Sequence, residues 1–187
     1  MNRKTAMKLF GLLGLLMLLS CGYADRHRNN SSCEQVLVDS LEVRVQDSLF
    51  SNVHYSRSQV LDALTQAQDS QVYYRLLALY GKTFFVSSDF DSILYYNRRV
   101  KEFFRNAYQS SESLQSPQWN DVLSDVYNIE GNVWMQLNRP DSAITDYKKA
   151  YEYRLKGRKL HLLPDICINT ADAYLHRSDL AHTASYY

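Results

Sequence analysis

The sequence predicts an all-α protein, and three observations support this fold class. Glycine and proline, the residues that most often form turns, number only 6 and 3 among 187 residues. Tyrosine is abundant, with 15 copies. From about residue 33 onward, apolar residues recur at the three- and four-residue intervals of an amphipathic helix. Few turn formers and helically spaced apolar residues favour long helices over a β-sandwich with many turns.

The composition also limits the kinds of partner. Hydrophobic residues make up 45% of the chain, so most of it is expected to fold rather than stay disordered. The formal net charge is +1, and the basic residues form no stripe along the sequence. Nucleic acid is therefore not an expected partner.

The first 21 residues are predicted to be an export signal. Arg3, Lys4 and Lys8 form a positive region, and a continuous apolar run follows at residues 9–19. A membrane-spanning helix needs about 20 apolar residues, so this shorter run is typical of a signal peptide. The tetrapeptide Leu-Leu-Ser-Cys at residues 18–21 resembles the lipobox of bacterial lipoproteins. The resemblance implies that Cys21 is lipidated and becomes the first mature residue; the alternative is an ordinary signal peptide with an accidental cysteine.

Residues 22–32 are polar and are predicted to be a tether between the lipid and the fold. No acidic cluster follows Cys21, so there is no sign of a surface-export tag. The expected location is therefore the cell envelope, with the chain lipid-anchored to a membrane and facing the periplasm. Cys33 and Cys167 could form a disulfide in such an oxidising compartment. Alternatively they are two separate thiols, with Cys167 buried in a helix.

Residues 33–68 are assigned to N-terminal helices. Ser32 and Gln35 fit a capping box before the first of them. The short alternating stretch at residues 41–45 could instead be a strand, and a second helix is expected over residues 58–68. A third helix is expected to start after Asp69, and a fourth to follow a break at residues 88–89 and end before a polar stretch at 108–117.

The clearest predicted helix starts at residue 117, with Ser116 as its N-cap and Pro117 as its first residue. Its apolar stripe runs from Trp119 to Leu137, and Glu130 interrupts it. A turn at residues 138–140, another helix and a basic interruption at 156–159 come next. A further helix opens near residue 164, and a last one near residue 178.

Residues in the middle of the chain resemble a known repeat. Gly131, Trp134, Ala143, Tyr147 and Ala150 have the spacing of the tetratricopeptide repeat, a helix–turn–helix unit of about 34 residues. Small residues at 131 and 143 let the two helices approach, and the two aromatic side chains fill the space beside that contact. Ala150 leaves room for the next unit. Because one helix pair cannot bury its apolar face alone, neighbouring units are expected to stack.

Two neighbouring stretches match the same pattern less closely. Gly81 and Phe84 belong to an earlier unit, and Ala171 and Tyr174 belong to a later one. The repeats are therefore expected at about residues 69–108, 117–157 and 162–187 of a region covering 69–187. The glycine-equivalent positions are separated by 50 and 40 residues, so the unit length varies. The alternative is a set of ordinary helical hairpins with chance small residues.

The resemblance implies a tetratricopeptide-like α-solenoid of antiparallel helix pairs. The last expected helix stops at Tyr187, which occupies the large aromatic position of its repeat. No polar capping helix follows. We therefore expect an array truncated at the C-terminus, which frays from about Leu162 onward.

The resemblance to tetratricopeptide proteins also implies where a partner binds. Such solenoids bind a protein or peptide along the concave surface formed by the first helix of each pair. The residues expected to face this surface are Asp125, Asn128, Asn132, Met135 and Gln136, followed by Asp165, Ile168, Asp172, Leu175 and His176. Asn132 matches the asparagine that bonds the backbone of a bound peptide in many of these grooves. The lysines that clamp the carboxylate of heat-shock chaperone tails are absent, so that particular activity is not expected.

No motif predicts catalysis, a cofactor or a metal site. The five histidines show no metal-ligand spacing. There is no paired CxxC, phosphate-binding loop or G-x-S-x-G motif. We expect no enzyme activity within these residues.

An Asp-Ser pair followed by an aliphatic residue or Ala recurs along the chain. The serines concerned are Ser40, Ser48, Ser92 and Ser142. The pattern resembles the O-glycosylation acceptor of exported Bacteroidetes proteins, which implies that these serines carry glycans. The local alternative is that an acidic residue suits the first turn of a helix because it complements the helix dipole.

The combination of lipobox and repeat resembles the N-terminal region of Bacteroidetes lipoproteins and sensor proteins that carry tetratricopeptide repeats. The resemblance implies a membrane-anchored module for protein–protein interaction, as the extracytoplasmic sensing or scaffold part of a signal-transduction protein. One alternative is a glycan-binding uptake lipoprotein of the starch-utilisation type. Another is the N-terminal fragment of a sensor histidine kinase or of a helix-turn-helix regulator.

Overall fold

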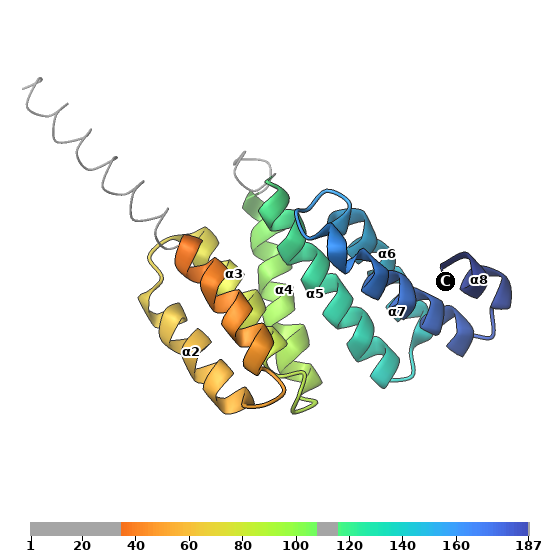
Figure 1. The fold of residues 1–187 in the computed structure, drawn as a ribbon, viewed down its shortest axis with the longest axis horizontal. Helices are drawn as coiled ribbons and strands as arrows, with labels where there is room; N and C mark the ends of the chain where they lie inside the picture. Colours follow the sequence, from red (N-terminus) through yellow and green to blue (C-terminus); the bar gives the residue numbers. More distant parts are fainter. Residues whose placement is uncertain (1–34, 108–115, 187) are drawn as a thin grey trace, which may run out of the picture.

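The computed structural model describes residues 35–107 and 116–186 (Figure 1). Within these ranges every regular element is a helix and none is a strand, which confirms the predicted all-α class for this part of the chain. Residues 41–45, whose alternation also suited a strand, lie inside the first helix. The predicted signal segment, the tether and Cys33 lie outside the described residues.

Eight α-helices follow one another along the described residues. The first covers residues 35–48. The others are α2 (Val53–Gln66), α3 (Ser70–Lys82), α4 (Phe90–Ala107), α5 (Pro117–Gln136), α6 (Pro140–Arg154), α7 (Leu163–His176) and α8 (Leu180–Tyr186). A short 3₁₀ helix, η3 (Leu160–Leu162), directly precedes α7.

Short polar side chains and prolines set where several helices begin. Asn52 caps α2 and Asp69 caps α3, each by accepting hydrogen bonds from backbone N–H groups of the first turn. Pro117 and Pro140 stand at the start of α5 and α6, where the missing N–H costs nothing. The cap at Asn52 also explains why α2 begins at Val53, before the predicted start at 58. Its first turn mixes apolar and polar residues and carries no helical apolar periodicity, so the cap is the signal that marks it.

Three turns between helices share one geometry. Ser88, Asn138 and Ser178 have positive φ angles of 53°, 57° and 62°. The amide that follows each donates to the carbonyl of Phe84, Trp134 or Tyr174, with N···O distances of 3.2, 2.8 and 2.9 Å respectively. This bond and the left-handed residue define a Schellman motif, which ends α5 and α7 directly and, in the first case, closes the tight turns at residues 83–88 that follow α3. The same helix–turn–helix arrangement therefore occurs three times, in register with positions 81, 131 and 171.

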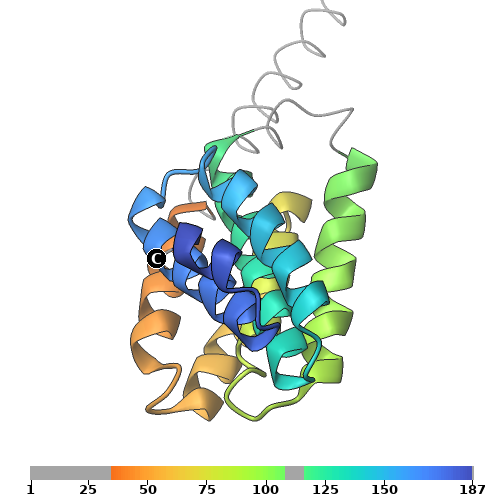
Figure 2. The same ribbon diagram turned by 90° about the vertical axis from the view of Figure 1, so that its right-hand side faces the viewer.

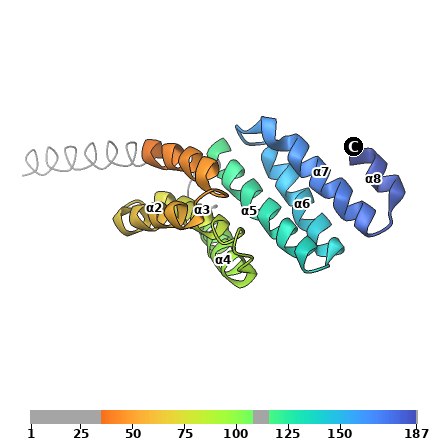
Figure 3. The same ribbon diagram turned by 60° about the horizontal axis from the view of Figure 1, so that its bottom comes forward.

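The helices pack mainly against their neighbours in sequence. The largest contacts join α3 with α4, α5 with α6, α6 with α7, and α7 with α8. Figure 1 shows the helix pairs in succession along the long axis, from the helix of residues 35–48 to α8, and Figure 3 shows the same succession from another side. The first helices of successive pairs also touch, α3 with α5 and α5 with α7. The described chain is thus an array of helix pairs.

The hydrophobic core is divided in the same way. One buried cluster joins the helix of residues 35–48 with α2 and α3, and a second joins α3, α4 and α5 around Trp119. A third joins α6 with α7 around Tyr147 and Tyr174. Each pair therefore buries its apolar face against the next pair, as stacking units do.

The small residues of the repeat pattern lie where helices come closest. A Cβ at Gly131 of α5 would overlap the ring of Tyr147 in α6. A Cβ at Gly81 of α3 would lie 3.1 Å from the Tyr96 Cβ of α4. The side chains of the alanines at 143, 150 and 171 are completely buried.

The aromatic positions of the pattern are used differently in each pair. Tyr174 is buried, while Phe84 is half-buried and stacks on Tyr96 at 5.6 Å between ring centroids. Trp134 is half-buried, and its Nε1 donates to Asp146 Oδ2 at 2.8 Å. These rings therefore contribute both packing and hydrogen bonds.

Candidate functional site

A groove of about 600 Å³ runs along one side of the array. Its walls come from alternate helices, namely the helix of residues 35–48, α3, α5 and α7, together with the connection between α6 and α7. Seen from the end of the array in Figure 2, the helix of residues 35–48 and α4 lie on opposite sides, and α4 contributes nothing to the lining. The groove thus lies on the surface made by the first helix of each pair.

Two buried arginines form the floor of the groove. Arg75 of α3 is 2% exposed and donates to Gln35 Oε1 at 2.5 Å and Asp39 Oδ1 at 2.6 Å. Its Nη2 also lies 3.3 Å from Glu42 Oε1. All three acceptors belong to the helix of residues 35–48. Because a buried charge is costly unless it is paired, these bonds hold that helix against α3.

Arg154, at the end of α6, repeats this arrangement farther along the array. It is 1% exposed and donates to Asp121 Oδ1 at 2.9 Å and to Asp125 Oδ1, both on α5. The Nε atoms of Arg75 and Arg154 are buried without a hydrogen-bond partner in the described part of the chain. Each guanidinium is therefore held at its terminal nitrogens only, that of Arg154 by two carboxylates and that of Arg75 by two carboxylates and the amide oxygen of Gln35.

Asp121 also fixes the connection between α6 and α7. Its carboxylate accepts hydrogen bonds from the backbone N–H groups of Arg158 and Lys159, at 3.0 and 3.1 Å. Gly157 passes so close to Asp121 that a Cβ there would collide with the carboxylate. On the other side, Asn120 Nδ2 donates to the carbonyl of Lys156 at 3.1 Å. Side chains near the start of α5 thus bind the main chain of the connection, both at two of its N–H groups and at one of its carbonyls.

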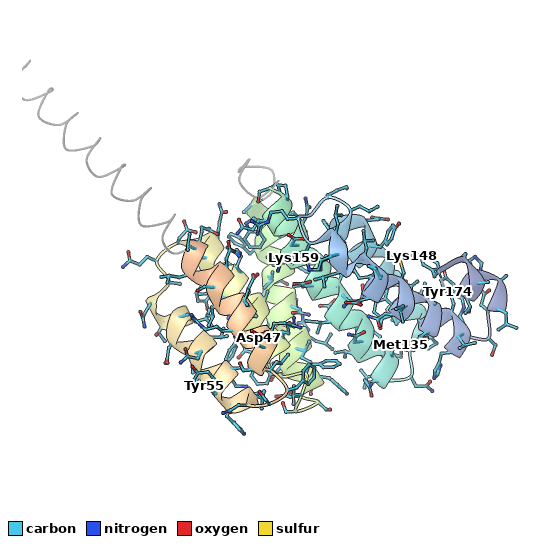
Figure 4. The ribbon with its side chains drawn as sticks, in the orientation of Figure 1. Asp47, Tyr55, Met135, Lys148, Lys159 and Tyr174 are labelled. Carbon is cyan, nitrogen blue, oxygen red and sulfur yellow. The ribbon has the colours of Figure 1, made fainter. Side chains whose placement is uncertain are left out.

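The connection crosses to the first helix of the array. Lys159 Nζ lies 2.9 Å from Glu42 Oε2, although the two residues are 117 positions apart. Gln118 Nε2 donates to Asp39 Oδ1 at 3.2 Å and makes a second bond between the same two regions. In Figure 4, Lys159 and Asp47, which both line the groove, lie apart, with Lys159 higher in the view than Asp47. The basic interruption of the sequence is therefore part of the groove wall.

The residues predicted to face a concave surface are only partly brought together. Asp125, Asn128 and Asp165 line the groove. Asn132 and Met135 do not, because Asn132 Oδ1 accepts from Tyr147 Oη at 2.7 Å and Met135 packs beside the α6–α7 cluster. The remaining predicted residues are exposed beyond the groove, on α7 for Ile168, Asp172, Leu175 and His176, and at the end of α5 for Gln136.

The repeat pattern did not predict the helix of residues 35–48 as a groove wall. Asp39, Glu42, Val43 and Asp47 of this helix line the groove, opposite residues of α5 and α7. It also missed Lys159. Residues 35–66 form a pair of helices joined by a short turn, like the later pairs, and this pairing is the signal that could have placed the first helix in the wall. The first helix nevertheless lacks the glycine of the repeat pattern.

The lining combines aliphatic and charged side chains. The carboxylates of Asp39, Asp47, Asp125 and Asp165 reach the surface, and Val43 is 62% exposed. Among the described residues that line the groove there is no Trp, Tyr or Phe. Aromatic rings of this protein pack between helices instead, as in the stack of Tyr74 on Phe103 at 4.1 Å.

A second polar cluster joins α4, α5 and α6 away from the groove. Glu130 of α5 is 3% exposed, and its Oε2 lies 2.5 Å from Lys101 Nζ of α4. Burial raises the pKa of Glu130, and the nearby Lys101 offsets only part of this rise. Burial also raises the pKa of Asp146, which accepts from Trp134, and the pKa of Tyr127 to about 12. Glu130 interrupts the apolar stripe of its helix because it meets a lysine from the preceding pair.

The four candidate acceptor serines differ in accessibility. Ser40 and Ser142 are exposed, whereas Ser48 and Ser92 are half-buried. Ser48 Oγ shares a hydrogen bond of 2.9 Å with Ser56 Oγ, and Ser92 Oγ donates to Asp89 Oδ2 at 2.7 Å. The exposed pair therefore offers better access to a modifying enzyme.

The other predicted sites concern the lipid, the thiols and metals. Cys21 and Cys33 lie outside the described residues, and Cys167 is a half-buried free thiol. In the described ranges, no group of three or more His, Cys, Asp or Glu side chains is placed to hold a metal ion. None of the helices described here is long and apolar enough to cross a membrane.

Comparisons with known proteins add no relative. No protein-family model matches the chain, and no curated protein matches its sequence. The described chain is thus placed in a class by its architecture, which is an all-α domain of about eight helices packed mainly with their sequence neighbours.

Proposed function

We propose that this protein is a membrane-tethered module of the tetratricopeptide type that binds a segment of a partner protein in its concave groove. One observation carries the proposal, namely a groove built from the first helices of four successive pairs. Helical arrays present extended concave surfaces of this kind to peptide partners. The recurrent turn at Ser88, Asn138 and Ser178 supports the repeat assignment.

The tether and the address belong to the same proposal. Lipidation of Cys21 would hold the array at a membrane of the cell envelope, on its periplasmic side. The module would then act as the extracytoplasmic sensing or scaffold part of a signal-transduction protein. Replacing Cys21→Ser and comparing membrane and soluble fractions tests the anchor, because the variant is expected to leave the membrane fraction.

The groove favours a protein partner over a glycan. Sugar rings stack on aromatic side chains, and none of the described lining residues is Trp, Tyr or Phe. The connection between α6 and α7 is itself polypeptide, and its backbone and side chains already bind α5 and the helix of residues 35–48. The lining is thus suited to polypeptide.

A matched pair of substitutions tests the binding function. Val43 is 62% exposed in the groove, and Leu61 is 47% exposed on α2 outside it. Val43→Trp is expected to obstruct the groove, whereas Leu61→Trp adds the same bulk elsewhere. We expect a pull-down from envelope extracts to recover a specific protein with the parent chain and with Leu61→Trp, and to lose it with Val43→Trp. Equal recovery by all three chains would place binding outside the groove, and recovery of no specific protein would count against the function.

A further inference from the structure

The chain's own connection shows what kind of segment the groove accepts. Residues 155–162 read LKGRKLHL, with three basic residues between leucines. Asp121 and Asn120 hold the main chain of this segment, Glu42 binds the Lys159 ammonium, and Leu162 enters the lining. A basic, leucine-containing stretch of polypeptide therefore already occupies one end of the groove.

The helical walls are complementary to such a segment in charge. The buried arginines of the floor offer little charge to a ligand, because each is paired with carboxylates and their side chains are 1% and 2% exposed. The accessible acids of the walls are Asp39, Glu42, Asp47, Asp125 and Asp165. Among the described residues, the wall helices contribute one accessible cation to the lining, Lys82, whose Nζ donates to Gln46 at 2.6 Å. The other accessible cationic side chains of the lining, those of Arg158 and Lys159, come from the connection itself.

Part of this acidic surface is still available. No ion pair or hydrogen bond among the described residues engages the carboxylates of Asp47 or Asp165, and both residues are exposed. Val43 lies exposed one turn before Asp47 on the same wall. On α7, Asp165 is followed by Ile168, which is 46% exposed three residues later, just beyond the groove. Both walls thus pair an unengaged carboxylate with an exposed aliphatic side chain.

We propose that the open part of this groove binds a segment of a partner protein that carries lysine or arginine together with aliphatic side chains. The connection at 155–162 occupies the other end in the same manner, and Lys159 competes with a partner's basic side chain for Glu42. This inference rests on the proposed peptide-binding function and adds the chemical class of the partner. Ammonium and guanidinium groups would pair with Asp47 and Asp165, and aliphatic groups would cover Val43.

The test uses synthetic peptides as probes. Fluorescein-labelled LKGRKLHL is titrated with the lipid-free chain, and its fluorescence anisotropy is compared with that of a peptide in which each Lys and Arg is replaced by Glu. We expect the basic peptide to bind saturably and the acidic peptide not to bind. The binding should weaken as the salt concentration rises from about 50 to about 300 mM, because salt screens exposed charges. Tighter binding of the acidic peptide, or binding of neither, would overturn the proposal.

Variants locate the binding. Asp47→Asn and Asp165→Asn are each expected to weaken binding of the basic peptide by about twofold to fivefold. Asp62→Asn, an exposed substitution on α2 outside the groove, serves as the control and is expected to change nothing. Lys159→Met is expected to tighten binding by about twofold to fivefold because it frees Glu42. Equal affinities for the parent, Asp47→Asn and Asp165→Asn chains would contradict the proposal.

The two functional ideas fail in different ways. If the pull-down partner is lost with Val43→Trp while the basic peptide does not bind, the groove binds a partner of other chemistry and only the present inference falls. If Val43→Trp changes nothing in either assay, the groove is not the binding surface and both fall.

Discussion

The α3–α4 pair and the α5–α6 pair have the same Schellman turn and a glycine at the same place, yet they fill the space between their helices differently. In α5–α6, the ring of Tyr147 lies directly on Gly131, and the Tyr147 hydroxyl bonds to Asn132. In α3–α4 the equivalent position is Asn97, which is buried and donates across to the Val126 carbonyl of α5 at 3.2 Å. The turn therefore defines the pair, while the large position serves packing within the pair in α5–α6 and bonding between pairs in α3–α4.

The buried arginines extend this comparison. Arg154 is held by Asp121, whose side chain is 3% exposed, whereas Arg75 is held by Asp39, whose side chain is 46% exposed. The contact of α6 with α5 therefore depends on a fully buried carboxylate, and the contact of α3 with the helix of residues 35–48 depends on a carboxylate that water can replace.

The largest expected effect separates these two carboxylates. Asp121→Ala is expected to lower the free energy of unfolding by about 3 kcal/mol, because it leaves Arg154 buried with one partner and releases the connection. Asp39→Ala is expected to cost about 1 kcal/mol, since Arg75 keeps two other acceptors and water can enter. Urea denaturation followed by circular dichroism measures both. Equal costs would show that burial of the carboxylate does not distinguish the two contacts.

The two glycines give the next comparison. Gly131→Ala is expected to destabilise the protein by about 2 kcal/mol, because the buried Tyr147 ring must move away from the new Cβ. Gly81→Ala is expected to change stability by less than about 1 kcal/mol, since a close contact of 3.1 Å is offset by the better helix propensity of alanine. The measurement is the shift in the urea midpoint. Tyr147→Leu is the matched background, in which Gly131→Ala should cost less; an unchanged cost would mean that the ring is not the obstacle.

A smaller effect is expected at the shared turn. Ser88→Gly is expected to stabilise the protein by about 1 kcal/mol, because serine at positive φ carries a steric cost that glycine lacks. Asn138→Gly is expected to gain only about 0.3 kcal/mol, since asparagine tolerates this conformation. Thermal unfolding of the two variants and the parent compares the gains. A loss of stability in Ser88→Gly would mean that the serine side chain makes up for its backbone strain.

The contact between the two pairs gives the smallest expected effect, as a dependence on pH. Burial raises the pKa of Glu130 above its value in the unfolded chain, so the folded state takes up this proton first as the pH falls. Stability from this group therefore rises as the pH falls through the folded pKa, and the rise is complete below the unfolded value. In Glu130→Gln this component should disappear from a plot of unfolding free energy against pH between about 4 and 8. An identical plot for parent and variant would contradict the assignment.

Much of the fold follows from local patterns. Apolar residues at helical spacing, caps such as Asp69 and prolines at 117 and 140 act within one turn of helix, so the sequence predicts the helices and their order. The pattern around Gly131 also predicts where two helices come closest. For the same reason Asp125 and Asn128 were placed on the inner face of α5, where they line the groove.

The groove itself was only partly predictable. The helix of residues 35–48 supplies a wall without sharing the glycine pattern, and Lys159 reaches Glu42 across 117 residues. Asn132 has the right spacing for a groove residue, but the oxygen of its side chain is engaged by Tyr147. These outcomes depend on which side chains meet across helices, and spacing within one helix carries no information about that.

The all-α class, the succession of helices, and the small and large positions of the central pairs could be predicted from the sequence alone, because they depend on interactions within a few residues. The groove could not, because it requires the fold to bring the first helix beside the later ones and the basic connection into the groove wall. The burial of Glu130 opposite Lys101 likewise appears only in the folded structure. Those features arise from contacts between segments that are distant in the sequence, and such contacts depend on the burial and the charge of both partners.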